Sequence, residues 1–162
     1  MPGAFKALAA VAAENLGYVT NDDAHALSIP IGTVNAMARR GQIERVCHGV
    51  YRMPVIPPGH LDAYKLATLW PDRRGLISHS SALELRGIRD LDPARIHVTV
   101  PTSYRTHRAV PGPYALRHQD VAPADRECID GVPVVSLALA VSQVEADELT
   151  SGASQPQDLA LP

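Results

Sequence analysis

The chain has 162 residues, enough for one ordinary domain or two small ones, and 46% of them are hydrophobic, which is ample for a core. Its net charge of −2 is unevenly placed, because residues 1–126 hold all 15 Lys and Arg residues and the remainder holds six acids and no base. A mildly basic body with an acidic tail is compatible with nucleic-acid binding. The sequence shows no signal-peptide pattern and no apolar stretch near the roughly 20 residues that cross a bilayer, so we expect a cytoplasmic protein without membrane contact.

Two short helices separated by a brief turn are predicted after a first, Ala-rich helix over residues 4–15. Thr20 is a typical N-cap residue for the second helix, which Pro30 ends. A third helix is expected over residues 31–40. Its inward face comprises Ile31, Val34, Met37 and Ala38. This arrangement is typical of a helix-turn-helix, whose second helix can lie in the major groove of DNA.

A β-hairpin follows the third helix. Within residues 43–53, apolar residues flank His48 and Gly49, which indicates two strands joined by a tight turn. A hairpin directly after a recognition helix is a wing, and wings add contacts to phosphates or to the minor groove. Residues 1–54 are therefore predicted to form a winged helix-turn-helix domain that binds double-stranded DNA.

Proline-rich residues 54–59 are predicted to form a linker, and residues 60–142 a small mixed α/β domain. Its expected helices span residues 60–70 and the segment between Ser78 and Gly87, and its expected strands span residues 96–100, 114–118 and 132–135. Residues 143–162 are expected to form an acidic, disordered tail. The predicted fold class is α+β, with a winged helix-turn-helix followed by a small mixed α/β domain and a disordered tail.

The sequence also resembles a known family. A basic pair, a Gly and a Gly-Val-Tyr run occur within residues 17–24, 39–46 and 49–52. These segments look like the N-terminal domain of AbiEi-type antitoxins of type IV toxin–antitoxin systems. The resemblance continues through residues 78–83 and 96–101, and covers roughly residues 15–136. It implies an antitoxin that represses its own promoter and counters a nucleotidyltransferase-like toxin, without implying a stable complex with that toxin.

The residues expected to contact DNA are polar or basic side chains of the third helix, the hairpin and a basic loop in the second domain. They are Thr33, Asn35, Arg39, Arg40, Arg45, His48, Arg52, Arg105 and Arg108. The arginine pair at the end of the third helix can contact base edges, and Arg52 in the hairpin can contact phosphates. The basic loop is either a solvated loop or a second patch that grips the backbone.

No enzyme activity, metal or cofactor is expected. A metal-dependent nuclease needs an acid two residues before a Lys, and neither Lys6 nor Lys65 has one. His79 beside Ser80 lacks a third, orienting group, and the His and Cys residues match no metal spacing. Two other functions stay open. The chain could be a protein-interaction module that sequesters a toxin, or a stand-alone transcriptional regulator without antitoxin activity.

Overall fold

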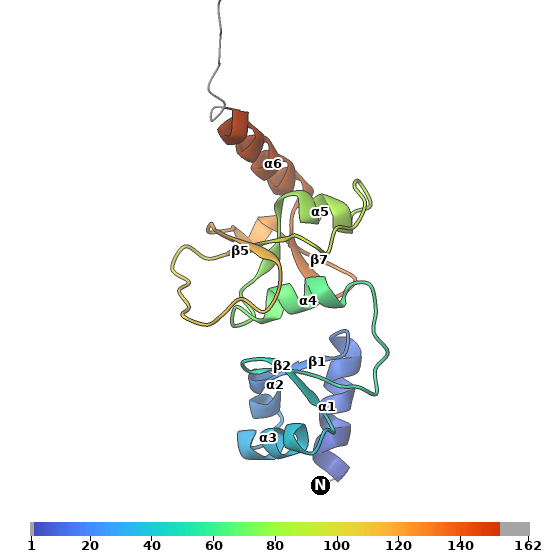
Figure 1. The fold of residues 1–162 in the computed structure, drawn as a ribbon. Coiled ribbons are helices and arrows are strands. Elements are labelled where there is room, and N and C mark those ends of the chain that lie inside the picture. The colour runs from blue at the N-terminus through green and yellow to red at the C-terminus, as the bar shows by residue number, and fades with distance from the viewer. Residues whose placement is uncertain (1, 153–162) are drawn as a thin grey trace, which may run out of the picture.

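The computed structural model describes residues 2–152 and contains two sheets (Figure 1). The N-terminal unit comprises α1 (Pro2–Glu14), β1 (Tyr18–Thr20), α2 (Asn21–Ala26), α3 (Ile31–Arg39), β2 (Glu44–Cys47) and β3 (Val50–Arg52). The C-terminal unit comprises α4 (Asp62–Leu69), β4 (Leu76–Ile77), α5 (His79–Leu85), β5 (Ile96–Val100), β6 (Tyr114–His118), a 3-10 turn (Pro123–Asp125), β7 (Arg126–Ile129), β8 (Val132–Val135) and α6 (Leu137–Gly152). This composition confirms a mixed α+β fold.

The N-terminal unit packs its three helices against an antiparallel sheet of strand order β1-β3-β2. Its apolar core includes Leu8, Val19, Val34, Met37 and Tyr51. The predicted N-cap of α2 is confirmed as a capping box, in which Thr20 Oγ1 accepts from the Asp23 amide and the Asp23 carboxylate accepts from the Thr20 amide. This reciprocal pair fixes where α2 begins.

The predicted hairpin is confirmed, and its turn requires a glycine. Gly49 has a φ of +70°, a backbone conformation that side chains with a Cβ rarely adopt. A Cβ at this position would also lie 3.2 Å from Asn21 Nδ2. The third strand of this sheet, β1, was not predicted, because it has only three residues, all of them buried, and shows no alternation.

The C-terminal unit contains a five-stranded mixed sheet of order β6-β5-β4-β8-β7. The pairs β5–β6 and β4–β8 are parallel, and the other two pairs are antiparallel. Its core gathers Tyr64 from α4, Ala140 from α6 and strand residues such as Ile77, Val98 and Val134. The strands predicted over residues 96–100, 114–118 and 132–135 are confirmed, whereas the short β4 and the polar β7 were not predicted.

The disordered tail predicted from residue 143 is wrong for residues 143–152, which continue helix α6. Gln143 is buried, and its Oε1 accepts a hydrogen bond from the His79 amide at 3.0 Å. Asp147 receives two hydrogen bonds from the Arg117 guanidinium. These contacts hold the acidic helix to the sheet. Residues 153–162, the rest of the predicted tail, lie outside the described residues.

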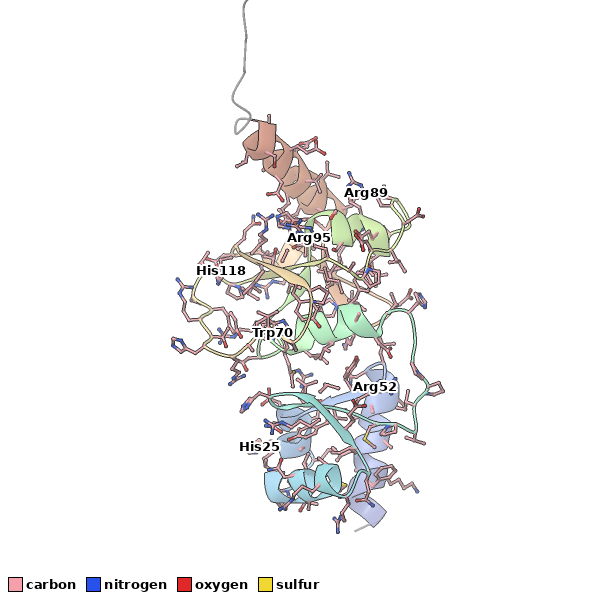
Figure 2. All side chains as sticks on the ribbon, viewed as in Figure 1. His25, Arg52, Trp70, Arg89, Arg95 and His118 are labelled. Carbon is pink, nitrogen blue, oxygen red and sulfur yellow. The ribbon has the colours of Figure 1, made fainter. Side chains whose placement is uncertain are left out.

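Polar and apolar contacts join the two units across the irregular segment 53–61. Asp62 at the start of α4 forms an ion pair with Arg52, and Arg73 forms one with Asp23 of α2 at 3.0 Å. Tyr18, Val50 and Leu69 form a small buried cluster at the same junction. Figure 2 shows Arg52 between the units and Trp70 on the side of the C-terminal unit that faces the hairpin. In the part of the chain that the structure describes, no helix is long and apolar enough to cross a membrane.

Candidate nucleic-acid interface

Helix α3 lies at one end of the molecule, and α6 extends from the other (Figure 1). A tight turn separates α2 from α3, with Ser28 at a φ of +56° and Pro30 as the N-cap residue. Val34 and Met37 on the inner side of α3 are buried in the core. These two anchors turn the opposite side of the helix toward solvent, on the end of the molecule that the C-terminal unit leaves uncovered.

The outer side of α3 carries the residues predicted there. Asn35, Arg39 and Arg40 are exposed, and Thr33 is partly exposed. One part of the predicted inward face is wrong, because Ile31 is 38% exposed. Ile31 is the first residue of α3, and the side chains of this helix that are buried in the core, Val34 and Met37, come later.

Asn35 is held in place by a residue that the sequence analysis did not single out. The hydroxyl of Tyr51 donates to Asn35 Oδ1 at 3.1 Å, and Tyr51 itself is 2% exposed on the central strand β3. The contact links the outer side of α3 to the sheet behind it. The sequence offers one signal for this role: Tyr51 lies in the predicted second hairpin strand, and a buried tyrosine hydroxyl usually finds a hydrogen-bond partner.

Arg45 of β2 extends the same surface. It pairs in register with Tyr51, and cross-strand partners project from the same face of a sheet, so Arg45 lies on the side that faces α3. The side chains of Arg39, Arg40 and Arg45 make no hydrogen bond or ion pair with any residue in the range 2–152, and all three residues are exposed. We call the set Thr33, Asn35, Arg39, Arg40 and Arg45 the α3 surface.

His48 and Arg108 lie elsewhere, at the junction of the two units. The hairpin turn faces the C-terminal unit, and His48 lines a cavity together with Trp70 and Arg108. Arg108 forms an exposed ion pair with Asp72 at 3.1 Å. The structure therefore brings the predicted basic loop next to the hairpin turn, and separates both from the α3 surface.

Arg52 does not have the exposure that a phosphate contact needs. Its side chain is 14% exposed and bonds to Asp62 Oδ2 at 3.1 Å and to the Ile56 carbonyl at 3.0 Å. It also lies over the ring of Tyr18. Arg52 lies on the second hairpin strand, as predicted, but β3 is the central strand of its sheet, and the Arg52 side chain contacts the linker and the start of α4.

Arg105 is exposed, and its guanidinium donates to the carbonyl oxygens of Thr102 and Tyr104. These bonds stabilise the loop on which Arg105 itself lies. The loop therefore orients Arg105 and Arg108 differently, the first along its own backbone and the second toward Asp72.

His79 pairs with a serine, but not with Ser80. Its Nδ1 lies 2.8 Å from the Oγ of Ser78, which is 0% exposed and also accepts from Thr99 Oγ1. Asp147 lies 3.9 Å from His79 Nε2, and burial lowers the pKa of His79 to about 4. A fully buried hydroxyl cannot reach a substrate, so this arrangement links α5, β5 and α6 within the core. Among residues 2–152, no group of His, Cys, Asp and Glu could hold a metal ion.

Comparison with known proteins finds a family similarity for the N-terminal unit. A family model described as "Transcriptional regulator, AbiEi antitoxin" matches residues 6–54, which include every residue of the α3 surface. The C-terminal unit lies outside the matched residues. No curated protein matches the sequence. Residues 6–54 are therefore similar to the AbiEi antitoxin family of transcriptional regulators.

Proposed function

We propose that this chain is a DNA-binding antitoxin of a type IV system that represses its own operon and counters a nucleotidyltransferase-like toxin. In this proposal the N-terminal unit acts as a winged helix-turn-helix, with α3 as the recognition helix and the β2–β3 hairpin beside it. The protein acts on double-stranded DNA in the cytoplasm and is not an enzyme. The family match of residues 6–54 supports a role in transcriptional regulation.

The observation that carries the DNA-binding proposal is the α3 surface, with three exposed arginines free of partners in the described chain. An α-helix with its side chains is about 10–12 Å across, and the major groove of B-DNA is about 12 Å wide, so a helix such as α3 fits into it. Arginine can donate two parallel hydrogen bonds to a guanine edge or to a phosphate, which suits Arg39, Arg40 and Arg45 to this task.

Binding to the DNA upstream of the gene tests the proposal. Fluorescence anisotropy with this duplex should give an affinity that falls linearly with salt on a double-logarithmic plot, because phosphate contacts release counterions. A scrambled duplex of the same length should bind more weakly and with a similar salt slope. Absence of binding at low salt would contradict the DNA-binding proposal.

Variants localise the contact. Arg39→Ala combined with Arg40→Ala should lower the affinity by at least about 10-fold, since a bidentate contact contributes roughly 1–3 kcal/mol. The matched control is Arg89→Ala combined with Arg95→Ala, which removes two exposed arginines at the far side of the C-terminal unit (Figure 2). Circular dichroism should show both double variants folded. Equal loss in both would place the contact outside α3.

Antitoxin activity needs a separate test, because repression and neutralisation are separable. The nucleotidyltransferase-like toxin of the adjacent gene should stop growth when it is expressed alone, and co-expression of this chain should restore growth. The Arg39→Ala, Arg40→Ala variant should still restore growth but should no longer repress the operon. Repression by the native chain without rescue of growth would favour the stand-alone regulator.

One observation favours the protein-interaction alternative. Leu149 near the end of α6 is 76% exposed and lines a shallow cavity together with the acidic Glu145 and Glu148. An exposed large apolar side chain among charges is compatible with a protein contact. Sedimentation of the chain mixed with the nucleotidyltransferase-like toxin of the adjacent gene distinguishes the two functions. A stable complex supports sequestration of the toxin, and the absence of a complex supports the DNA-binding antitoxin.

A further inference from the structure

A cavity of about 310 Å³ lies on the C-terminal unit, where β5 ends and β4 begins. This volume is at the lower end of the range of about 300–1,000 Å³ for ligand pockets, which suits one small molecule. Three arginines line the cavity, namely Arg73, Arg74 and Arg126, and no acidic residue in the range 2–152 lines it with them. The walls are therefore positively charged, and they favour an anion.

Arg126 is held in place on the wall of this cavity. Its Nε and Nη2 donate to the carbonyl oxygen of Val121, which also lines the cavity, at 3.0 Å and 2.8 Å. Its Nη1 makes no hydrogen bond with any residue that the structure describes, and Arg126 is exposed. A guanidinium that is already fixed loses little conformational freedom when it binds an anion, so Arg126 is prepared for one.

Arg74 is exposed, and its side chain makes no hydrogen bond or ion pair within residues 2–152. The turn that presents it is strained, because Asp72 and Arg73 have φ values of +52° and +61°, which residues with a Cβ rarely adopt. Strain of this kind is concentrated at functional sites. Arg73 is already paired with Asp23 at 3.0 Å, which leaves Arg74 and Arg126 to bind the anion.

The rest of the cavity offers a neutral donor and apolar side chains. Gln119 is exposed, and its Oε1 accepts from Gln143 Nε2 at 2.8 Å, so its own amide N–H groups remain to donate. Three partly exposed apolar side chains also line the cavity, and we call them the apolar wall: Leu76, Pro101 and Pro133. A bound molecule can reach all of these groups, and the apolar wall favours one that carries an organic ring beside its anionic group.

Two unpaired guanidiniums match a phosphate better than a carboxylate. A phosphate monoester carries a charge of about −1.5 to −2 at pH 7 and has three acceptor oxygens, so it can bind both arginines at once. A carboxylate has one charge and would leave one arginine uncompensated. The charge therefore indicates a phosphate monoester, and the apolar wall indicates that a ring is attached to it.

We propose that this cavity binds a nucleoside monophosphate. Arg74 and Arg126 bind the phosphate, Gln119 donates to an acceptor atom of the nucleoside, and the apolar wall contacts the planar base. The site lies outside residues 6–54 and outside the α3 surface, so it does not depend on DNA binding and its test is independent of that proposal.

Calorimetric titration and the melting temperature of the full chain test this site. Each of the four ribonucleoside 5′-monophosphates is added at constant ionic strength up to about 5 mM, enough to saturate a site with a Kd below about 0.5 mM. At least one should bind saturably and raise the melting temperature, because it binds the folded chain only. Inorganic phosphate, ribose 5-phosphate and the matching nucleoside are the parallel probes, and each should bind at least about 10-fold more weakly, since each lacks the base or the phosphate.

Three variants assign the binding to the cavity. Arg74→Gln and Arg126→Gln should each weaken it by about 10-fold or more, the range for losing a hydrogen bond to a charged group. Arg74→Gln should leave the melting temperature of the free chain unchanged, because the side chain has no partner in the part of the chain that the structure describes. The matched control is Arg95→Gln, an exposed arginine before the opposite end of β5 (Figure 2), which should bind like the native chain.

Other outcomes overturn the proposal. If no nucleotide binds, or if inorganic phosphate binds as tightly as the best nucleotide, the ligand class is wrong. If Arg74→Gln binds the nucleotide as the native chain does, the ligand lies elsewhere. If no nucleotide binds and Arg74→Gln lowers the salt slope of binding to the upstream duplex by about 1, the cavity contacts DNA phosphates instead.

Discussion

The hydroxyl of Tyr51 on the central strand β3 donates a hydrogen bond to Asn35 Oδ1 on the outer side of α3, at 3.1 Å. The bond fixes which end of the Asn35 amide faces the sheet. The two Nδ2 protons are then left to point toward solvent, where a base edge or phosphate can accept them. Tyr51 thus positions a side chain of the α3 surface without being part of that surface.

Removing this hydroxyl should weaken DNA binding without unfolding the chain. Tyr51→Phe removes one hydrogen bond of about 0.5–1.5 kcal/mol, so we expect a loss of roughly 2- to 12-fold in affinity for the upstream duplex. Tyr104→Phe is the matched control, because the Tyr104 hydroxyl is buried without a partner in the described chain. Anisotropy titrations of the two variants make the comparison. Equal affinities would show that the orientation of Asn35 does not matter for binding.

Arg52 should affect stability rather than DNA binding. Arg52→Ala leaves the Asp62 carboxylate, which is 17% exposed, without its cation and removes the bond to the Ile56 carbonyl. Loss of such a partner typically costs about 1–3 kcal/mol, measurable as a lower urea midpoint with an unchanged slope. In the double variant with Asp62→Asn the two losses should not add, because the residues share one contact. A weaker DNA affinity at unchanged stability would instead support a phosphate contact for Arg52.

The different outcomes for Arg45 and Arg52 show what the sequence could and could not predict. Strand alternation and the glycine turn sufficed to predict the hairpin, and both arginines lie on its strands. Their exposure depends on which strand is central, and that depends on β1, whose three buried residues carry no periodic signal. A basic residue in a hairpin could therefore be identified from the sequence, but its accessibility could not.

The end of α6 was missed for a related reason. Acidic residues and few apolar anchors are typical of a solvated tail, and local composition was the only information available. The contacts that stabilise this helix come from residues far away in the sequence, namely His79 for Gln143 and Arg117 for Asp147. The strands over residues 96–100 and 114–118 were predictable because their alternation is a local property.

The contact between α5 and α6 can be tested at Gln143. Gln143→Ala leaves the buried amide of His79 without its acceptor and removes the bond from Gln143 Nε2 to Gln119. We expect the free energy of unfolding to fall by about 1–3 kcal/mol. Ser142→Ala, at the exposed neighbouring position, should leave it within about 0.5 kcal/mol. Equal effects of the two substitutions would mean that α6 is not held by this contact.

Finally, His79 should make the chain less stable in mild acid. Its folded-state pKa is lowered from 6.5 to about 4, chiefly by burial; Asp147 opposes the shift, and Arg117 and His97 contribute to it. Between these two values the unfolded chain binds a proton that the folded chain does not, so stability is lost as the pH falls from 6.5 to 4. His79→Asn removes the titrating group, and asparagine tolerates the positive φ of +54° at this position. Urea unfolding of both chains across this range should give a difference in unfolding free energy that shrinks toward pH 4, because only the native chain carries the acid penalty of His79. Curves that remain parallel would show that His79 takes up its proton equally in both states.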